Sequence, residues 1–360
     1  MSNGLAGIVA AETVLSDVDG EGGRLILRGY ELADLAGRVS YEAAAAVLWE
    51  GFVTDAGASA LQQAIGAGRA AAYERFAGVA ANGFGALEPV EAMRLLLAGI
   101  GDSDTLAAPA ALVGATGVAA AMAIAASEGR GVSQPDPALP HATDLLRMIS
   151  GHAPSAAAAR AFETYMVTVI DHGLNASTFA ARVVASTGAG LTSSLVAALS
   201  ALKGPLHGGA PGPVLDMLDA IGAPENAEAW MEAALARGER IMGFGHRAYR
   251  VRDPRADVLR AALTEMGGGA GRLDQARQIE AAALAVLKRR KSGRRLDVNV
   301  EFYTALLLDA LDIPRSGFTP VFAAARAAGW IAHVLEQQKT GRIIRPDSRY
   351  VGPEPLAKAG

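Results

Sequence analysis

The chain has 360 residues, of which 33 are basic and 37 acidic, so its formal net charge is −4. It contains no cysteine, which excludes disulfide bonds, thiolate nucleophiles and cysteine-ligated zinc and is compatible with a reducing cytoplasm. Because nucleic acid partners select basic surfaces, the slight negative charge gives no reason to expect such a partner. The length suggests about two domains.

Hydrophobic residues make up 51% of the chain, yet only 5% of the residues are aromatic, and much of the apolar content is alanine. Alanine is the best intrinsic helix former, so this composition favours closely packed helices. The pattern offers no strands that could alternate with the helical segments, which disfavours Rossmann and TIM-barrel folds. We therefore predict an all-α fold with a short β-containing segment at the N-terminus.

In chain order, the first predicted elements are two short strands near residues 7–12 and 24–28, separated by the Gly/Asp-rich turn cluster 16–23. Beyond Tyr30 the pattern is helical, and Ser40 is expected to cap the first long helix. The predicted helices lie near 40–49, 58–72, 89–100, 108–127, 141–149, 155–186, 191–202, 213–220, 226–237, 254–265, 273–290, 300–311 and 318–339.

The segment 105–127 carries no charge and is long enough to cross a bilayer. It consists mainly of alanine and glycine, however, and contains few of the leucine, isoleucine and phenylalanine residues that favour membrane insertion. We predict a buried, alanine-rich helix hairpin and no membrane association.

Six histidines are present, and none lies at the spacing of a zinc-binding pair. The sequence therefore gives no reason to expect a metal. His141, next to Pro140, and His152, between glycine and proline residues, are interpreted as loop or surface residues. His333 lies within an apolar helical segment and is interpreted as a core histidine with satisfied hydrogen bonds.

The other three histidines lie in more suggestive surroundings. His172 belongs to a polar cluster, Asp-His-Gly-Leu-Asn-Ala-Ser-Thr, inside an apolar helical region, where polar groups need partners in the protein or on a ligand. His207 and His246 each stand between glycines at a helix junction, where the backbone can approach a ligand closely. Each of the three remains open to a structural interpretation.

Four charged residues are further candidates. Arg326 interrupts an apolar helix, so its charge must be paired or meet a ligand. Arg255 and Arg345 are either surface charges or forks that bind a carboxylate in bidentate fashion. Glu301, at a predicted helix start, either complements the helix dipole or acts as a partly desolvated base. Spacing alone does not choose between these interpretations.

Taken in order, these segments resemble the citrate synthase family. The resemblance covers residues 4–50 and 140–353 well and residues 55–130 only in general character. It is carried by Gly-Leu-Ala-Gly-Ile-Val-Ala-Ala-Glu-Thr with Ser-Asp-Val-Asp-Gly, Asp-His-Gly-Leu-Asn-Ala-Ser-Thr-Phe, Gly-Pro-Leu-His-Gly-Gly-Ala, Gly-Phe-Gly-His-Arg-Ala-Tyr-Arg with Asp-Pro-Arg, Asn-Val-Glu-Phe-Tyr, Ala-Arg-Ala-Ala-Gly-Trp and the C-terminal Arg-Pro…Tyr-Val-Gly-Pro.

The resemblance implies an all-α, two-domain fold, with residues 1–207 and 313–360 in a large domain and 208–312 in a small one. It implies an acyltransferase that condenses acetyl-CoA with oxaloacetate and water to give citrate and CoA. By the same resemblance, Glu301 would be the general base, His207 would face the thioester oxygen, and His246 would polarise the ketone of oxaloacetate.

The resemblance also implies the binding residues. His172, Arg255 and Arg326 would hold oxaloacetate, and Arg345 would reach in from the partner subunit, so a homodimer is expected. Arg250 and Arg294 would meet the phosphates of CoA. No metal or redox cofactor is implied, because CoA enters as a substrate thioester.

One departure is Glu301, where the family usually has aspartate; Val298 also stands where a proline is usual. The extra methylene displaces the carboxylate unless the backbone compensates, and misplacement on that scale can cost about 100-fold in rate. Two alternatives therefore stay open. One is a 2-methylcitrate synthase that uses propionyl-CoA, and the other is a catalytically weakened relative that binds or senses the same ligands.

Overall fold

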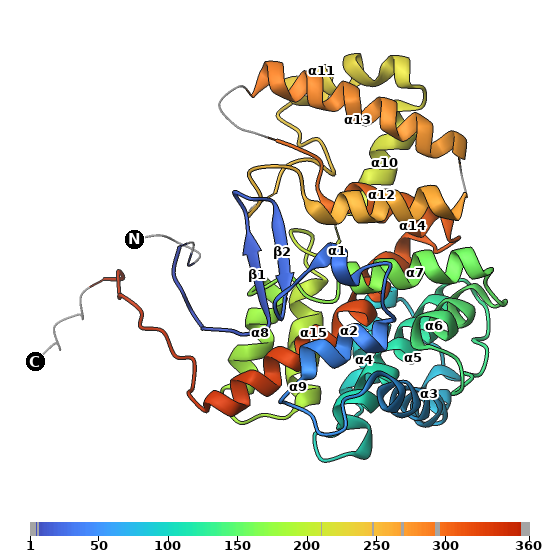
Figure 1. Cartoon of the computed structure of the whole chain (residues 1–360), viewed down its shortest axis with the longest axis vertical. Helices are drawn as coiled ribbons and strands as arrows, with labels where there is room; N and C mark the ends of the chain where they lie inside the picture. The colour runs from blue at the N-terminus through green and yellow to red at the C-terminus, as the bar shows by residue number, and fades with distance from the viewer. Residues whose placement is uncertain are drawn as a thin grey trace, which may run out of the picture.

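The computed structural model describes residues 5, 7–209, 211–246, 248–267, 270–291 and 296–353. Most of these residues form helices, with a small antiparallel sheet near the N-terminus (Figure 1). The strands are β1 (Ser16–Asp19), β2 (Arg24–Leu27) and β3 (Tyr30–Glu31), and the helices are α1 (Leu32–Leu35), α2 (Tyr41–Trp49), α3 (Ala58–Ala80), α4 (Pro89–Ala98), α5 (Pro109–Ser127), α6 (His141–Ser150), α7 (Ala156–Thr168), α8 (Ala176–Ala185), α9 (Leu191–Leu202), α10 (Pro211–Ile221), α11 (Ala227–Ala236), α12 (Pro254–Met266), α13 (Ala270–Arg290), α14 (Val300–Ala310) and α15 (Phe318–Thr340), with 3₁₀ turns at Thr105–Ala107, Pro224–Asn226 and Arg315–Gly317.

The all-α prediction is confirmed, and most predicted helices form within a few residues of their expected limits. Ser40 caps α2 as expected, since its side chain accepts a hydrogen bond from the backbone N–H of Ala43. Helix α3 is longer than predicted because its alanine-rich pattern continues to Ala80.

The sheet differs from the prediction at its first strand. Residues 7–12 form no strand, and β1 instead occupies the first half of the predicted turn cluster. Asp19 pairs with Arg24 at the hairpin end, and the Asp19 carboxylate accepts the backbone N–H of Gly22 at 2.7 Å, which closes the turn. Strand β2 buries Leu25 and Leu27 on one face, so the hairpin is anchored to the helical core.

Helix α5 packs against α3, α4, α6 and α15 and is buried along nearly all its length. The segment 105–127 is thus one helix preceded by a 3₁₀ turn, not the predicted hairpin, because Pro109 fits the first turn of the helix instead of breaking it. Helix α5 and the segment 315–339 are long and apolar enough to cross a membrane, but both lie mostly inside the structure, as core helices do.

The predicted helical region 155–186 is interrupted. Helix α7 ends at Thr168 and α8 begins at Ala176, where the Asn175 side chain accepts hydrogen bonds from the backbone N–H groups of Ser177 and Thr178. Gly173 adopts φ +61°, a left-handed conformation that glycine takes without steric cost. The break matters because it places His172 in an irregular segment instead of inside a helix.

His141 is fully buried at the start of α6, so its interpretation as a loop or surface residue is wrong. Its Nδ1 atom lies 3.3 Å from the guanidinium of Arg69, which in turn makes a 2.8 Å ion pair with Asp144. This cluster joins helices far apart in the chain, which no local pattern around His141 could indicate. The other two interpretations are confirmed: His152 is exposed, and His333 is buried and hydrogen-bonded.

Helices α10 to α14 gather at one end of the molecule and the remaining helices at the other (Figure 1). The predicted domain limits, 208–312 against 1–207 and 313–360, stay a prediction. The hairpin β1–β2 lies beside the region where the two groups of helices meet (Figure 1).

The packing of α3 against α5 depends on glycine. A Cβ atom on Gly68 would lie 2.5 Å from the Cα atom of Ala111, whereas one on Gly78, in the same helix, would meet nothing within 4 Å. We expect Gly68→Ala to lower the free energy of unfolding by about 1–3 kcal/mol through overpacking. The matched control Gly78→Ala should raise it by up to about 1 kcal/mol. Urea denaturation measures both, and equal effects of the two variants would contradict the packing argument.

Candidate active site

His172 lies in the segment between α7 and α8, next to the buried Asp171. Asp171 is fixed by His333, whose Nε2 lies 3.2 Å from its carboxylate, and by the Ser16 hydroxyl. Burial, followed by the charge of Arg255, lowers the pKa of His172 well below its ordinary value, so the imidazole is neutral.

The loop that carries His246 pairs with the segment that leads into Glu301. Phe244 and Val298 form an isolated antiparallel bridge, and the Asn299 side chain donates to the carbonyl of Gly245 at 2.8 Å. Gly245 has φ +81°, and a Cβ atom there would lie 2.9 Å from the Leu296 side chain. The glycine before His246 is therefore required for the two loops to approach each other.

Hydrogen bonds determine the tautomer of His246. Its Nδ1 atom accepts the backbone N–H groups of Ala248 and Tyr249, both at 3.0 Å. Burial, followed by the charge of Arg255, lowers the pKa of His246 to about 4. The imidazole is therefore neutral, and its single proton is on Nε2, which can donate to a ligand.

Arg255 lies in the first turn of α12 and is held by Asp253, which caps the same helix. The Asp253 carboxylate accepts from Nε and Nη2 of Arg255 at 3.0 and 2.8 Å and also from the backbone N–H of Val300. Nη2 of Arg255 lies 3.3 Å from Nε2 of His246. Because both groups are donors, they are placed to share an acceptor oxygen on a ligand.

Arg326 is almost fully buried on α15. Its Nε donates to the carbonyl of Val169, and its guanidinium lies 4.8 Å from the centre of the Phe322 ring. No carboxylate of the described residues forms an ion pair with it, and burial lowers its pKa to about 10. A buried guanidinium without a paired carboxylate is suited to bind an anionic ligand.

His207 lies in the loop between α9 and α10, with its ring centre 6.5 Å from that of Phe322. Its Nε2 atom is 2.9 Å from the hydroxyl of Ser177, which also accepts the indole N–H of Trp330. Burial and then the charge of Arg326 lower the pKa of His207 to about 4, so this imidazole is neutral as well.

Glu301 is partly buried in the first turn of α14, where its backbone N–H donates to the Asn299 side chain. Burial raises the pKa of its carboxyl to about 7 and outweighs the opposing charges of Arg255 and Arg326. A carboxylate with such a pKa can take up a proton near neutral pH. The site thus combines one base, three neutral imidazoles and two guanidinium groups.

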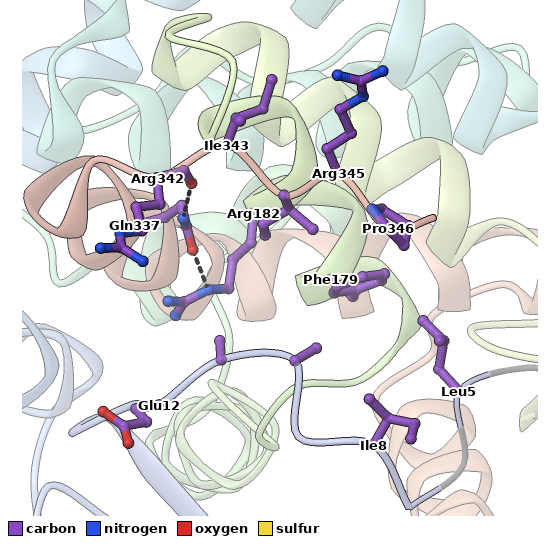
Figure 2. A pocket seen from close by; sticks show the side chains of 13 residues that line it. Leu5, Ile8, Glu12, Phe179, Arg182, Gln337, Arg342, Ile343, Arg345 and Pro346 are labelled. Atoms are coloured by element: carbon purple, nitrogen blue, oxygen red, sulfur yellow. Dashed lines mark hydrogen bonds between the residues drawn. The ribbon is translucent and has the colours of Figure 1, made fainter. Parts of the chain in front are cut away.

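Two predicted residues, Arg250 and Arg345, are not brought into this cluster, and Arg294 lies outside the described residues. Arg250 is exposed on the loop after Tyr249. Arg345 is exposed in the C-terminal tail and lines a cavity of about 460 Å³ with residues such as Ile8, Phe179 and Ile343 (Figure 2).

One protein family model matches nearly the whole chain. The family model described as "Citrate synthase, C-terminal domain" matches residues 4–347. The chain belongs to the citrate synthase family. It is thereby an enzyme of the acyltransferase class.

Individual relatives in the citrate synthase family align over nearly the whole chain. A citrate synthase of Haloferax volcanii is 37% identical, with 99% of this chain and 97% of the relative covered. A 2-methylcitrate synthase of Mycobacterium tuberculosis is 36% identical, with 98% and 91% covered. The crystal structure of citrate synthase from Thermotoga maritima aligns with a TM-score of 0.87 at 31% identity, covering 100% of this chain and 98% of that one.

Sequence reasoning missed three polar residues of this citrate synthase site. Ser177 contacts His207, Asp253 holds Arg255, and the hydroxyl of Tyr249 lies 3.2 Å from Nε2 of His172. Each belongs to a segment quoted for the family resemblance, and Asp253 also stands at a helix-capping position. Within the described residues, no group of three or more His, Cys, Asp or Glu side chains is placed to hold a metal ion.

The raised pKa of Glu301 has a consequence for stability. Because the folded protein holds this proton more tightly than the unfolded chain does, ionised Glu301 costs stability as the pH rises from 4.5 to about 7. We expect Glu301→Gln to be more stable than the wild type by about 1–3 kcal/mol near pH 8 and by much less near pH 5. Urea denaturation at both pH values measures this difference. A wild type that is the more stable protein near pH 8 would contradict the assigned environment of Glu301.

Proposed function

We propose that this enzyme condenses acetyl-CoA with oxaloacetate and water to form citrate and CoA. The observation that carries the proposal is the Glu301 carboxyl, with its pKa raised to about 7, beside buried guanidinium groups and neutral imidazoles. The methyl group of acetyl-CoA is a very weak carbon acid, so its deprotonation requires a base and an enol-stabilising donor together.

Oxaloacetate would bind first, through its two carboxylates. The guanidinium of Arg326, which has no paired carboxylate among the described residues, and the Nη2 group of Arg255 are the cationic partners. His172 would contribute a neutral polar contact beside them. The Nε2–H group of His246 would donate to the ketone oxygen and so polarise the carbon that is attacked.

Glu301 would then remove a proton from the methyl carbon of acetyl-CoA while His207 donates a hydrogen bond to the thioester oxygen. In the structure the hydroxyl of Ser177 donates to Oδ1 of Asn175 at 2.7 Å and lies 2.9 Å from Nε2 of His207. During the reaction this hydroxyl would turn its proton to Nε2 of His207, which leaves Nδ1–H of the imidazole as the donor. A neutral imidazole can stabilise the enol in this way without protonating the base beforehand.

The enol carbon would attack the ketone carbon of oxaloacetate and form the new carbon–carbon bond. The developing alkoxide would take the Nε2 proton of His246, which gives citryl-CoA, and the proton that Glu301 removed from the methyl group would return to His246 through water. Water would then attack the thioester carbonyl while ionised Glu301 takes one of its protons. The carbon–sulfur bond would break, the thiolate of CoA would leave with the proton from Glu301, and the new carboxyl group would release its proton to solvent. All three steps use side chains of the chain itself, and we propose that no metal or redox cofactor takes part.

The longer side chain of Glu301 does not favour the alternative of a weakened binding protein. Its first-turn position and its raised pKa are those of a base that can work near neutral pH. Acetyl-CoA is proposed as the acyl donor on the strength of relatives named citrate synthase. Propionyl-CoA, the donor expected of a 2-methylcitrate synthase, is the comparison substrate in the assay below.

A homodimer is part of the proposal. The N-terminal arm and the C-terminal tail expose large apolar side chains, including Ile8, Val9, Ile343, Tyr350 and Val351. Exposed apolar side chains gathered on two terminal segments indicate a surface covered by another chain. Arg345 lies in this tail, away from the cluster of its own subunit, and would complete the oxaloacetate site of the partner.

The remaining assignments are proposals of the same kind. Arg250 and Arg294 would bind the phosphates of CoA, and the enzyme would act in the cytoplasm on small molecules, without nucleic acid or membrane partners. The lack of cysteine and the net charge of −4 are compatible with this location and these partners.

A thiol-release assay with oxaloacetate tests the reaction. We expect wild-type protein to release CoA from acetyl-CoA with a higher kcat/KM than from propionyl-CoA. Glu301→Gln should lose at least about 100-fold in kcat because no base remains, whereas Glu301→Asp should retain measurable activity. In the wild type, kcat should fall as the pH drops through about 7, where Glu301 becomes protonated. Unchanged turnover in Glu301→Gln would refute the proposed base.

Mixed dimers test the role of Arg345. Arg345→Ala and Glu301→Gln homodimers should each be nearly inactive. If Arg345 acts across the interface, a heterodimer of the two variants contains one intact site, so mixing them should restore up to about a quarter of the wild-type rate at equal amounts. If Arg345 acts within its own subunit, no site is intact in any dimer and mixing restores nothing.

A further inference from the structure

The hairpin β1–β2 touches both loops that carry the proposed oxaloacetate ligands. On one side it meets the segment of His172. The hydroxyl of Ser16 bonds to the Asp171 carboxylate and accepts the backbone N–H of Gly173 at 3.0 Å. A Cβ atom on Gly173 would lie 3.3 Å from the side chain of Val18, so strand β1 packs closely against this segment.

The tip of the same hairpin meets the loop that follows His246. The backbone N–H of Arg250 donates to the carbonyl of Gly20 at 2.8 Å. A Cβ atom on Gly20 would lie 2.3 Å from the carbonyl oxygen of Ala248, and one on Gly23 would lie 2.7 Å from the side chain of Val251. The tip therefore fits against residues 248–251 without room for a single methyl group.

Tyr249 connects the two loops directly. Its hydroxyl lies 3.2 Å from Nε2 of His172, and its ring centre is 4.8 Å from that of His246. The guanidinium of Arg255 lies 5.9 Å from the same ring centre. Tyr249 is itself buried. It therefore links the three proposed oxaloacetate ligands His172, His246 and Arg255 inside the protein.

We propose that the hairpin β1–β2 is a brace that sets the spacing of His172 and His246, and that Tyr249 is the positioning residue through which it acts. The inference rests on the proposed function, because it concerns the oxaloacetate site of that reaction. Ser16 holds the segment of His172, Gly20 holds the backbone on either side of Tyr249, and the Tyr249 hydroxyl closes the connection between them.

The chemistry of Tyr249 agrees with this role. Burial raises the pKa of its phenol, so the group keeps its proton and is a hydrogen-bond donor at every working pH. The neutral His172 can accept this proton on Nε2, and the bond restricts rotation of the imidazole ring. A site whose ligands are held in place before binding loses less conformational freedom when oxaloacetate enters.

Tyr249→Phe tests the positioning role, since it removes the hydroxyl and keeps the ring. The matched control is Tyr303→Phe, which removes another buried hydroxyl that bonds to Glu280 away from the ligands. We expect Tyr249→Phe to raise both the Kd of oxaloacetate, measured by calorimetry, and its KM about 5- to 10-fold. Its kcat and its KM for acetyl-CoA should stay within about 2-fold of wild type, and Tyr303→Phe should leave the Kd of oxaloacetate unchanged.

Gly20→Ala tests the hairpin, with Gly78→Ala as the control because its Cβ atom meets nothing. We expect Gly20→Ala to weaken oxaloacetate binding at least about 3-fold at an unchanged melting temperature of the helical core, and Gly78→Ala to bind as the wild type does. An unchanged Kd in Tyr249→Phe overturns the positioning role, and an unchanged Kd in Gly20→Ala overturns the brace. If either variant bound oxaloacetate and acetyl-CoA more weakly by the same factor, the role tested by that variant would also be overturned.

Calorimetry separates this inference from the proposed function because binding needs no turnover. Wild-type protein that binds oxaloacetate but releases no CoA refutes the proposed reaction. The Kd of oxaloacetate in Tyr249→Phe and Gly20→Ala still tests the brace in that case. Normal turnover together with unaltered binding in both variants refutes the brace alone. Wild-type protein that does not bind oxaloacetate refutes both.

Discussion

The buried guanidinium of Arg326 is the constraint on which the rest of the site depends. It stands in the apolar stretch 321–330 of α15, and no described carboxylate forms an ion pair with it. Burial of this charge is costly, and the nearby carboxylates of Asp171 and Glu301 offset that cost only in part, so the guanidinium is suited to bind an anionic ligand. The charges of Arg326 and Arg255 both lower the pKa of His172 and both oppose the rise in the pKa of Glu301. At His207, the charge of Arg326 adds to the effect of burial and lowers the pKa further.

Burial acts in opposite directions on the two kinds of titratable group around these cations. It lowers the pKa values of the histidines, which therefore stay neutral and donate or accept single hydrogen bonds. It raises the pKa of Glu301 against the attraction of the two guanidinium groups. One dehydrated environment thus produces both a base that works near neutral pH and donors that do not protonate it.

The fold supplies this environment from segments far apart in the chain. Glycines permit the loop of His246 to pair with the loop before Glu301, and Asp253 ties both to the start of α12. On the opposite side, helix α15 contributes Arg326 and Trp330, and the latter supports the Ser177–His207 contact. The N-terminal hairpin then spans the two loops, which explains why so small a sheet lies beside the site in an otherwise helical protein (Figure 1).

The sequence by itself determined the helical class, the approximate helix limits and six candidate side chains that meet at the site, which are His172, His207, His246, Arg255, Glu301 and Arg326. These follow from local causes: alanine content, a capping serine at position 40, and polar residues standing where apolar ones would be expected. The family motifs added the roles of these residues, because their order and spacing carry information that no single motif holds.

Only the tertiary structure decided which polar groups meet. His141 is buried because Arg69, over 70 residues away in the chain, provides its partner. The break before α8 is stabilised by the hydrogen bond of Ser16 to Asp171 and by the capping side chain of Asn175. Ser177, Asp253 and Tyr249 entered the site through contacts across the chain. Hydrogen-bond pairing, burial and the resulting pKa values depend on distances between remote segments, and a linear pattern of residues does not contain those distances.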